Sequence, residues 1–342
     1  MKEPFDKPVA ANLTFSFVVP VYNRPGEVQE LLESIACQTA REFEVIIVED
    51  GSNDKCNLIC AQFENQLDIK YYYKENSGPG QSRNFGFERA KGNYCIFLDS
   101  DCVLPSAYFQ TVRSALHEAY SDAFGGPDSA HPDFSTFQKA MNYAMTSFLT
   151  TGGIRGSSEK LGKFHPRSFN MGYSRAVFDK TKGFSKMRFG EDIDISIRIL
   201  SEGFSTRLIK DAYVFHKRRT NLRQFYKQVY NSGIARINLY KRHPHSLKTV
   251  HFAPALFVLT TLVLCVFSAV VSPFFLAPLV VHMLTIAIDS TAKNRNLRTG
   301  LLSVVTSYVQ LCGYGLGFVN AVWKRIILNR DEYVAYKNNF YK

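Results

Sequence analysis

The first half of the chain alternates short apolar runs with segments in which apolar residues recur every three or four positions. The apolar runs are rich in β-branched and aromatic residues, which favours strands. They lie at Phe15–Val21, Phe43–Val48, Ile69–Tyr73 and Tyr94–Leu98. The segments between them predict amphipathic helices from Pro25 to Ile35, over Asn57–Phe63 and over Gln81–Ala90. This order implies right-handed crossovers and a parallel sheet.

After Pro105 the alternation loosens. Further strands are predicted at Phe124–Pro127, Phe169–Tyr173 and Tyr213–Phe215. They would extend the parallel strands into a mixed, Rossmann-like sheet, so the expected fold class is α/β.

The C-terminal third has a different pattern, because residues 252–288 contain no Asp, Glu, Lys or Arg. One helix needs ~20 apolar residues to cross a bilayer. Ser272-Pro273 predicts a turn in the middle, so we expect a helical hairpin of Phe252–Val271 and Phe274–Ile288. The second arm is short and is expected to be tilted or re-entrant. A buried helical subdomain in a soluble protein is the alternative.

A third apolar segment, Leu301–Trp323, is milder and contains several polar and small residues. Basic residues flank all of these segments: Lys241, Arg242, Lys248, Lys293, Arg295, Arg298, Lys324, Arg325 and Arg330. The positive-inside rule places such flanks in the cytoplasm. The third segment is therefore expected to be interfacial or re-entrant, and its crossing stays open.

The length of 342 residues suits one large domain with an appendage. We expect the α/β domain over residues 1–220 and a basic amphipathic, membrane-flanking helical segment over 221–250. A transmembrane hairpin, the third apolar helix and a C-terminal tail would occupy residues 251–342.

Most of the formal net charge of +11 comes from residues 205–248. Nucleic acid is one partner for such a stretch, and anionic lipid headgroups or a phosphate-bearing acceptor are another. The neighbouring uncharged residues 252–288 favour the membrane over nucleic acid. No N-terminal signal peptide is expected, because the first apolar run, Phe15–Val21, is too short. The seven cysteines show no metal-ligand spacing and are expected to be free thiols in a reducing compartment.

Polar motifs follow three of the predicted strands. They are Tyr22-Asn23, Glu49-Asp50-Gly51-Ser52 and Asp99-Ser100-Asp101. Ligands of open α/β sheets bind beyond the carboxyl ends of the strands. Asp99 and Asp101 would point to the same side of an extended segment and would suit a hard divalent cation.

These motifs resemble glycosyltransferase family 2, an inverting family with the GT-A fold. The resemblance is carried by FSFVVPVYNRPGEVQELLESIACQT, EVIIVEDGSNDKC, NSGPGQSRNFGFERAKGNYCIFLDSDCVLP and GFSKMRFGEDIDISIRIL, in this order. It covers roughly Phe15 to His216. The C-terminal region resembles the membrane tail of some members.

The resemblance implies a donor site. Asp50 would contact the nucleotide base, and Glu49 stands where the family more often has Asp. The residues expected at the base, ribose and phosphates are Pro20, Tyr22, Arg24, Gly80, Arg83 and Asp99. Asp101 would be the more direct ligand of Mn²⁺ or Mg²⁺, with Asp99 beside it and His216 as a third ligand.

The family's catalytic base corresponds to Asp192, with Glu191 binding or orienting the acceptor. Asn170, Arg218 and Arg219 are expected near the acceptor or diphosphate. The polymerising members carry a Q-x-x-R-W motif, whereas this chain has Gln228-Val229-Tyr230-Asn231-Ser232, which favours a single-sugar transferase.

The sequence thus predicts a metal-dependent, inverting hexosyltransferase facing the cytoplasm at the inner membrane. It would move one sugar from a nucleotide-sugar, expected to be a UDP-sugar, to a lipid-linked or other saccharide acceptor in cell-envelope polysaccharide biosynthesis. A transferase acting on polyprenyl phosphate is the nearest alternative. A non-catalytic, membrane-anchored nucleotide-sugar-binding protein and a nucleic-acid-binding protein are the others. The sugar, the linkage and the oligomeric state are left open.

Overall fold

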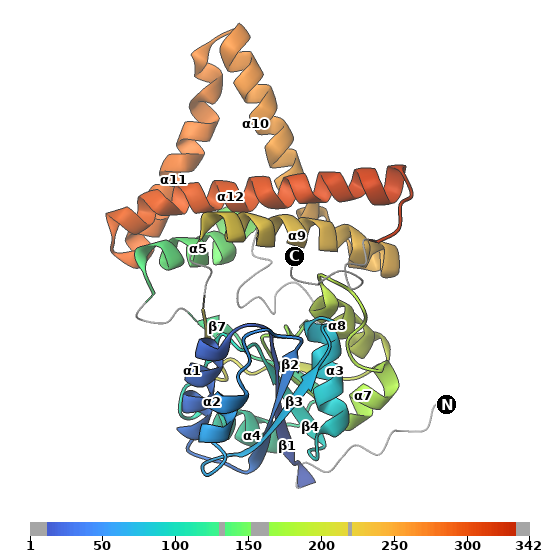
Figure 1. Cartoon of the computed structure of the whole chain (residues 1–342). Coiled ribbons are helices and arrows are strands. Elements are labelled where there is room, and N and C mark those ends of the chain that lie inside the picture. Colours follow the sequence, from blue (N-terminus) through green and yellow to red (C-terminus); the bar gives the residue numbers. More distant parts are fainter. Residues whose placement is uncertain (1–11, 130–133, 152–163, 218–220, 333–342) are drawn as a thin grey trace. The chain divides into compact units, whose positions relative to one another are not determined.

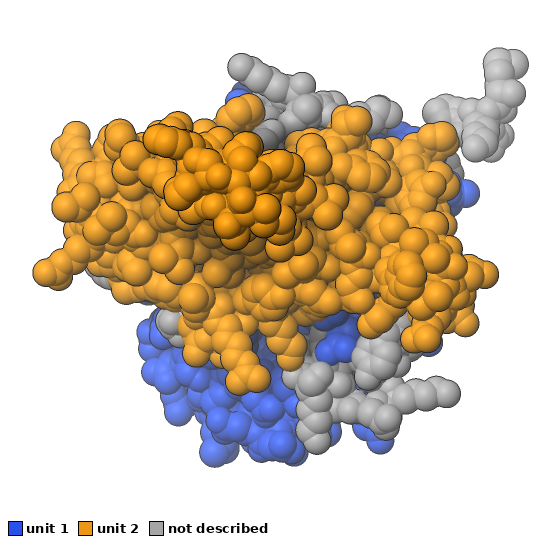
Figure 2. Space-filling model, turned by 90° about the horizontal axis from the view of Figure 1, so that it is seen from above, with its two compact units in different colours: residues 1–129, 162–217, 334–342 blue, residues 130–161, 218–333 orange. Residues whose placement is uncertain are grey.

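The structure is a computed structural model that describes residues 12–129, 134–151, 164–217 and 221–332. The chain forms two compact units, which Figure 2 shows in different colours. The first unit holds residues 12–129 and 164–217 of the described ranges, and the second holds 134–151 and 221–332. Segment 134–151 therefore groups with the C-terminal helices, although the sequence pattern assigns it to the expected 1–220 domain.

A seven-stranded sheet with the order β3-β2-β1-β4-β8-β6-β9 forms the centre of the first unit (Figure 1). Its parallel part consists of β1 (Phe15–Val21), β2 (Phe43–Asp50), β3 (Asp68–Lys74) and β4 (Tyr94–Leu98). β8 (Asn170–Ser174) is antiparallel to β4 and to β6 (Ala123–Gly125), and β9 (Thr206–Leu208) is parallel to β6. The predicted mixed α/β sheet is confirmed, but β9 was not among the predicted strands.

Helices bury both faces of this sheet. They are α1 (Pro25–Ala36), α2 (Asn57–Gln62), α3 (Pro79–Arg89), α4 (Tyr108–Glu118), α7 (Arg175–Thr181) and α8 (Glu191–Ser201). In β1, Phe17 belongs to the same hydrophobic cluster as Leu31 and Phe109, whereas Val18 belongs to a second cluster with Phe87. Successive residues of a strand point to opposite faces. A central strand covered on both faces is therefore expected to be mostly apolar, as the run FSFVVPV is; its one polar side chain, Ser16, is buried and donates to Glu44 Oε1 at 2.7 Å.

The strand predicted at Tyr213–Phe215 does not belong to the main sheet. It lies in a second, small sheet. This sheet consists of β5 (Cys102–Val103), β10 (Val214–His216) and β7 (Asp128–Ser129). β10 runs antiparallel to β5, with His216 opposite Cys102. This pairing brings residue 216 beside the turn that follows β4, which the spacing along the chain does not reveal.

The second unit is helical. It contains α5 (Thr136–Thr146), α6 (Phe148–Thr151), α9 (Leu222–Arg242), α10 (Ala253–Val270), α11 (Ala277–Asn294) and α12 (Leu297–Ala321). Short 3-10 turns, Pro244–Ser246, Thr249–Phe252 and Pro273–Leu276, link them, and a π-helical turn, Val322–Ile327, continues α12.

Three helical stretches of this unit are long and apolar enough to cross a membrane: Thr249–Val270, Pro273–Asn294 and Leu297–Ile327. The second extends beyond the predicted end at Ile288 and includes Asp289. That carboxylate accepts hydrogen bonds from Tyr143 Oη at 2.6 Å and Lys293 Nζ at 2.8 Å. An acid that is partnered in this way does not interrupt the helix.

α9 and α12 lie side by side at backbone contact (Figure 1). A Cβ atom on Gly317 would lie 2.0 Å from the carbonyl oxygen of Tyr230, and one on Gly233 would lie 2.2 Å from that of Tyr314. α5 packs near one end of this pair, where Met141 and Met145 join Phe225 and Val229 in one cluster. The glycines of the third apolar segment therefore serve helix packing.

Candidate active site

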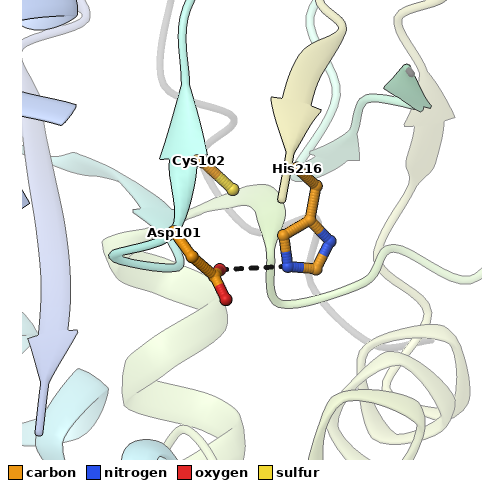
Figure 3. A group of neighbouring side chains, drawn as sticks. All are labelled: Asp101, Cys102 and His216. Carbon is orange, nitrogen blue, oxygen red and sulfur yellow. Dashed lines mark ion pairs between the residues drawn. The ribbon is translucent and has the colours of Figure 1, made fainter. Parts of the chain in front are cut away.

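Charged side chains gather at the carboxyl ends of β1, β2 and β4 and at the start of α8. β4 ends at Leu98, and the turn 99–101 places Asp99 and Asp101 there. Asp101 Oδ1 lies 3.0 Å from His216 Nε2, and Asp99 Oδ2 lies 4.0 Å from the same nitrogen. Figure 3 shows the Asp101 carboxylate and the His216 ring facing each other, with Cys102 beside them. The three residues predicted as metal ligands are thus neighbours.

Cys102 belongs to the same cluster, because the ligand atoms of Asp101, Cys102 and His216 all lie within 4.8 Å of one another. Complete burial raises the pKa of the Cys102 thiol well above its usual range, and the thiol donates to the carbonyl oxygen of Phe169 at 3.6 Å. Besides this thiol, the donors gathered here are two carboxylates and one imidazole. Such oxygen-rich sets suit Mg²⁺ or Mn²⁺ rather than the softer metals that thiolates select.

Two neighbours fix this group. The Phe169 ring stacks on the His216 imidazole, with ring centroids 5.3 Å apart. Arg24 Nη1 donates to Asp101 Oδ2 at 2.6 Å. Arg24 was predicted beside the base and ribose, but the structure places its guanidinium on the metal-site carboxylate.

Asp50 is fully buried and its carboxylate is engaged by the chain itself. It accepts hydrogen bonds from the backbone N–H of Ser77 at 2.9 Å and of Gly78 at 2.8 Å, and it pairs with Lys74. The first effect of Asp50 is therefore to hold the turn 74–78 at the end of β2. Its contact with a nucleotide base stays a prediction. To make that contact, the carboxylate would have to bind the base in addition to Ser77, Gly78 and Lys74.

Glu49 organises the next turn in the same way. Its carboxylate accepts from Ser52 Oγ and, at 2.8 Å, from the backbone N–H of Cys56. The Ser52 hydroxyl in turn accepts from the backbone N–H of Asn23 at 2.7 Å. These bonds tie the ends of β1 and β2 together. Pro20 lies buried near the end of β1, and Tyr22 follows it half-buried at the same sheet edge.

Arg83 connects the turn after β4 to the start of α8. It lies on α3 with a buried side chain, and its Nη2 atom donates to Asp99 Oδ1 at 2.5 Å. Its Nη1 atom lies 3.4 Å from Glu191 Oε1. Gly80 allows this approach, because a Cβ atom there would lie 3.3 Å from Glu191 Cγ. Arg83 was predicted to pair with a phosphate, and in this structure it bridges two carboxylates.

Glu191 and Asp192 begin α8 after Gly190, whose φ of 87° requires a residue without a side chain. Asp192 Oδ2 accepts from Arg167 Nε at 2.5 Å, and Oδ1 accepts from the backbone N–H of Ile193 at 2.9 Å. Burial opposes ionisation of Asp192, but the Arg167 charge and hydrogen bond outweigh it, so the pKa of Asp192 lies below its usual value. Burial and the neighbouring Asp192 charge raise the pKa of Glu191 to about 7.

Arg167 was missed from the sequence. It stands alone between Pro166 and Ser168, with no spacing that links it to Asp192. Only the placement of the chain before β8 next to the first turn of α8 brings the two side chains together. One signal could have pointed to Arg167. A buried carboxylate such as Asp192 needs a cationic partner, so a nearby arginine or lysine had to be expected.

Two further predictions concern the acceptor. Asn170 is fully buried: its Nδ2 donates to the carbonyl oxygen of Ala212 at 2.8 Å, and its Oδ1 accepts from Tyr108 Oη at 2.6 Å. The structure thus places Asn170 in the core, where it joins β8 to the segment before β10. Arg218 and Arg219 lie outside the described residues.

The site as a whole is a row of alternating charges. Arg24 contacts Asp101, Arg83 contacts Asp99 and Glu191, and Arg167 contacts Asp192. Each of these carboxylates therefore has a fixed cationic neighbour, which compensates the charge of several acids that lie close together. The arrangement can hold a cation at one end and accept a proton at the other.

Residues 16–182 match the family model described as glycosyl transferase family 2. The fold is of the GT-A type, and the matched segment, just under half of the chain, is similar to glycosyl transferase family 2. The chain is similar to an uncharacterized glycosyltransferase of Rickettsia conorii, with 40% identity over 95 residues, or 28% of this chain and 16% of that protein.

It is also similar to the poly(ribitol-phosphate) beta-N-acetylglucosaminyltransferase TarS of Staphylococcus aureus, with 34% identity over 114 residues, 32% of this chain and 20% of that protein. The matched segments therefore span about a sixth to a fifth of the length of these curated relatives. Among solved structures, the mannosyltransferase PcManGT of Pyrobaculum calidifontis, in complex with GDP-Man and Mn²⁺, aligns with a TM-score of 0.62. The identity is 17% and the alignment covers 90% of each chain, which shows a shared fold.

Proposed function

We propose that this protein is a metal-dependent, inverting glycosyltransferase that moves a single sugar from a nucleotide diphosphosugar to a hydroxyl acceptor. The observation that carries the proposal is the link between the two ends of the site. Arg83 contacts Asp99 of the candidate metal site and Glu191, which stands next to Asp192. The donor diphosphate would bind near Asp99 and the acceptor hydroxyl near Glu191 and Asp192. Arg83 would lie between the two groups.

On the donor side, Asp99, Asp101 and His216 are the residues that would hold Mn²⁺ or Mg²⁺. The cation would supply neutralisation of the diphosphate as it leaves. Pro20, Tyr22, Arg24 and Asp50 lie at the same sheet edge and would form the nucleotide pocket. We expect a UDP-sugar, while the GDP-Man held by the Pyrobaculum enzyme makes GDP-sugars the first competitor.

On the acceptor side, Asp192 would take the proton of the attacking hydroxyl. Arg167 holds the Asp192 carboxylate in the ionised state, which is the state that a base needs. Glu191, about half protonated at pH 7 because its pKa is about 7, can in its protonated form donate a hydrogen bond to the acceptor. The two acids would thus act in different protonation states, which their environments set apart.

The acceptor is proposed to be lipid-linked, because the second unit carries helices that are long and apolar enough to enter a membrane. A saccharide on a polyprenyl carrier would present its hydroxyl close to the bilayer surface. The basic residues of α9 would attract a phosphate-bearing acceptor to the same surface.

The proposal is tested by hydrolysis and transfer with a panel of UDP- and GDP-sugars, using the full chain in detergent with Mn²⁺, with Mg²⁺ and with EDTA. We expect slow, metal-dependent release of one nucleoside diphosphate, lost in Asp101→Ala. Asp192→Asn should keep donor binding and lose transfer. The acceptors are a polyprenyl diphosphate saccharide and polyprenyl phosphate itself. Absence of binding and turnover for every donor in folded protein would overturn the proposal.

A further inference from the structure

The third apolar segment has two unlike faces. Its buried face is rich in small and polar residues, among them Ser303, Thr306, Ser307, Gln310, Gly313 and Gly317, and also contains Leu311 and Phe318. Its exposed face is an apolar stripe of Leu301, Val305, Leu316, Val319, Trp323 and Ile327. Residues at this spacing follow one side of a helix. A helix that crossed the bilayer alone would instead be apolar all round.

The buried face of α12 is covered by α9 along much of its length. The two backbones touch at Gly233 and Gly317. Further along, Arg325 Nε donates to Asn238 Oδ1 at 2.9 Å, and Lys241 Nζ donates to the carbonyl oxygen of Arg325 at 3.0 Å. α12 therefore moves with α9 as one body.

α9 cannot enter the hydrocarbon. Its sequence contains five basic residues and no acidic one: Arg223, Lys227, Arg236, Lys241 and Arg242. Charged side chains at the bilayer centre are costly. Because α12 is held along α9, crossing by α12 would carry these charges into the membrane.

The hairpin of α10 and α11, unlike α9, is largely apolar, and so is the tip at its turn. Val270, Val271 and Phe274 surround the turn and are 79%, 63% and 86% exposed. A tip that emerged into water on the far side would leave these side chains solvated without a partner. With their adjoining 3-10 turns, the two arms have 22 residues each, which corresponds to about 33 Å of helix. They are inclined to α12 (Figure 1), so the tip lies less far from α12 than the full length of an arm.

We propose that the second unit attaches to a single leaflet and crosses the bilayer nowhere. α12 lies in the plane of the interface with its apolar stripe toward lipid, and α9 lies on its water side. The hairpin dips into the hydrocarbon and returns. The partner surface is a leaflet with anionic headgroups, which complements α9 and the basic residues Arg298 and Lys324 at the two ends of α12. This topology rests on the membrane association in the proposed function.

The test uses full-length variants with one introduced cysteine, in vesicles of phosphatidylcholine with phosphatidylglycerol; the four buried cysteines, Cys56, Cys60, Cys95 and Cys102, are kept. Cys37, Cys265 and Cys312 are first replaced by serine. A fluorophore is then placed at Leu301→Cys, Leu316→Cys, Ile327→Cys or Val271→Cys, and its quenching by lipids with shallow or deep nitroxides is measured. Leu58→Cys on the first unit, 74% exposed, is the matched water-facing control.

We expect the three α12 positions to share one shallow depth and the tip position to be quenched most by the deep nitroxide. A membrane-impermeant maleimide should reach Leu58→Cys from outside and Val271→Cys from neither side. Modification of Val271→Cys by reagent trapped in the lumen would overturn the proposal. So would a depth profile in which Leu316→Cys is deep while positions 301 and 327 lie on opposite sides.

Failure of the protein to float with vesicles would overturn this topology together with membrane association. Transfer to a soluble acceptor by such protein would show that the proposed chemistry stands independently.

Discussion

Arg167 is the side chain that decides the state of Asp192. Its guanidinium meets the Asp192 carboxylate at 2.5 Å and more than offsets the effect of burial on that pKa. Glu191 behaves differently: Arg83 Nη1 lies 3.4 Å from its carboxylate, but burial and the Asp192 charge outweigh this cation and raise the pKa of Glu191 to about 7. At the residue scale, therefore, Arg167 sets apart the pKa values of two adjacent carboxyl groups.

Replacing Arg167 by methionine should raise the pKa of Asp192, because the ion pair and the hydrogen bond are both lost. The acid limb of the kcat/KM profile against pH is then expected to move to higher pH, with kcat falling about 10–100-fold. Arg167→Lys should restore part of the rate and of the profile. The matched control is Arg113→Met, which removes the pair with Glu42 on the surface. An acid limb that stays in place would show that Asp192 is not the titrating base.

Glu191 gives a pH-dependent stability. Its pKa in the folded protein is about 7, above the ordinary 4.5, so the folded state binds the proton more tightly than the unfolded state. Its stabilising contribution is complete below pH 4.5 and is lost as the pH rises through 7. Glu191→Gln should therefore gain stability over the wild type as the pH rises from 5 to 8, by on the order of 1–3 kcal/mol.

The measurement is the thermal midpoint of both proteins in detergent at each pH, without donor or metal. Glu88→Gln, on the exposed surface of α3, is the control and should show no such trend. A constant difference between Glu191→Gln and wild type across this range would contradict the raised pKa.

At the scale of elements, two small features matter most. The strand β10 positions a residue of the candidate site, and Gly317 sets the packing of α12 on α9 in the second unit. β10 is only three residues long, yet its antiparallel pairing with β5 delivers His216 to Asp101. Gly317 lets α12 approach α9 until backbone meets backbone. Each feature depends on very few residues, three in β10 and one glycine in α12. A single substitution is therefore enough to disturb it.

Gly317→Ala should destabilise the second unit, because the added Cβ atom would lie 2.0 Å from the Tyr230 carbonyl oxygen, a backbone atom that cannot rotate away. We expect a loss of about 1–3 kcal/mol, as for other overpacked sites. Thermal unfolding in detergent measures it. Gly26→Ala is the control: its Cβ atom would meet nothing within 4 Å, so the helix α1 should be unchanged or slightly more stable.

At the scale of the whole molecule, charge and apolar surface would cooperate in the membrane binding that we propose. Apolar side chains of the hairpin and of α12 are exposed, and α9 adds basic residues. Each Lys or Arg near an anionic surface contributes about 1 kcal/mol at moderate ionic strength. The double variant Arg223→Gln, Lys227→Gln should therefore bind anionic vesicles about tenfold or more weakly and respond less to salt.

Vesicle co-sedimentation across a salt series measures this partition. Lys91→Gln, Lys186→Gln changes the same charge at exposed positions of the first unit and should leave binding unaltered. Equal losses in the two double variants would mean that net charge alone, rather than α9, sets the attraction.

The amino-acid sequence by itself determined the parallel half of the sheet. β1, β2 and β4 are buried on both faces, so their apolar runs are continuous and visible in the chain. The polar motifs after them followed from the same rule, since the carboxyl ends of neighbouring parallel strands meet at one edge. The apolar hairpin was equally legible, because the uncharged run 252–288 is far longer than a strand or helix of a soluble core requires.

Only the tertiary structure decided which charges meet. Arg24 meets Asp101, Arg83 joins Asp99 to Glu191, and Arg167 holds Asp192, although these partners lie between 16 and 108 positions apart in the chain. Asn170, polar and close to the motifs, proved to be a core residue. Spacing reports which side chains share a helix or strand face, whereas ion pairs and glycine contacts between elements depend on how those elements pack.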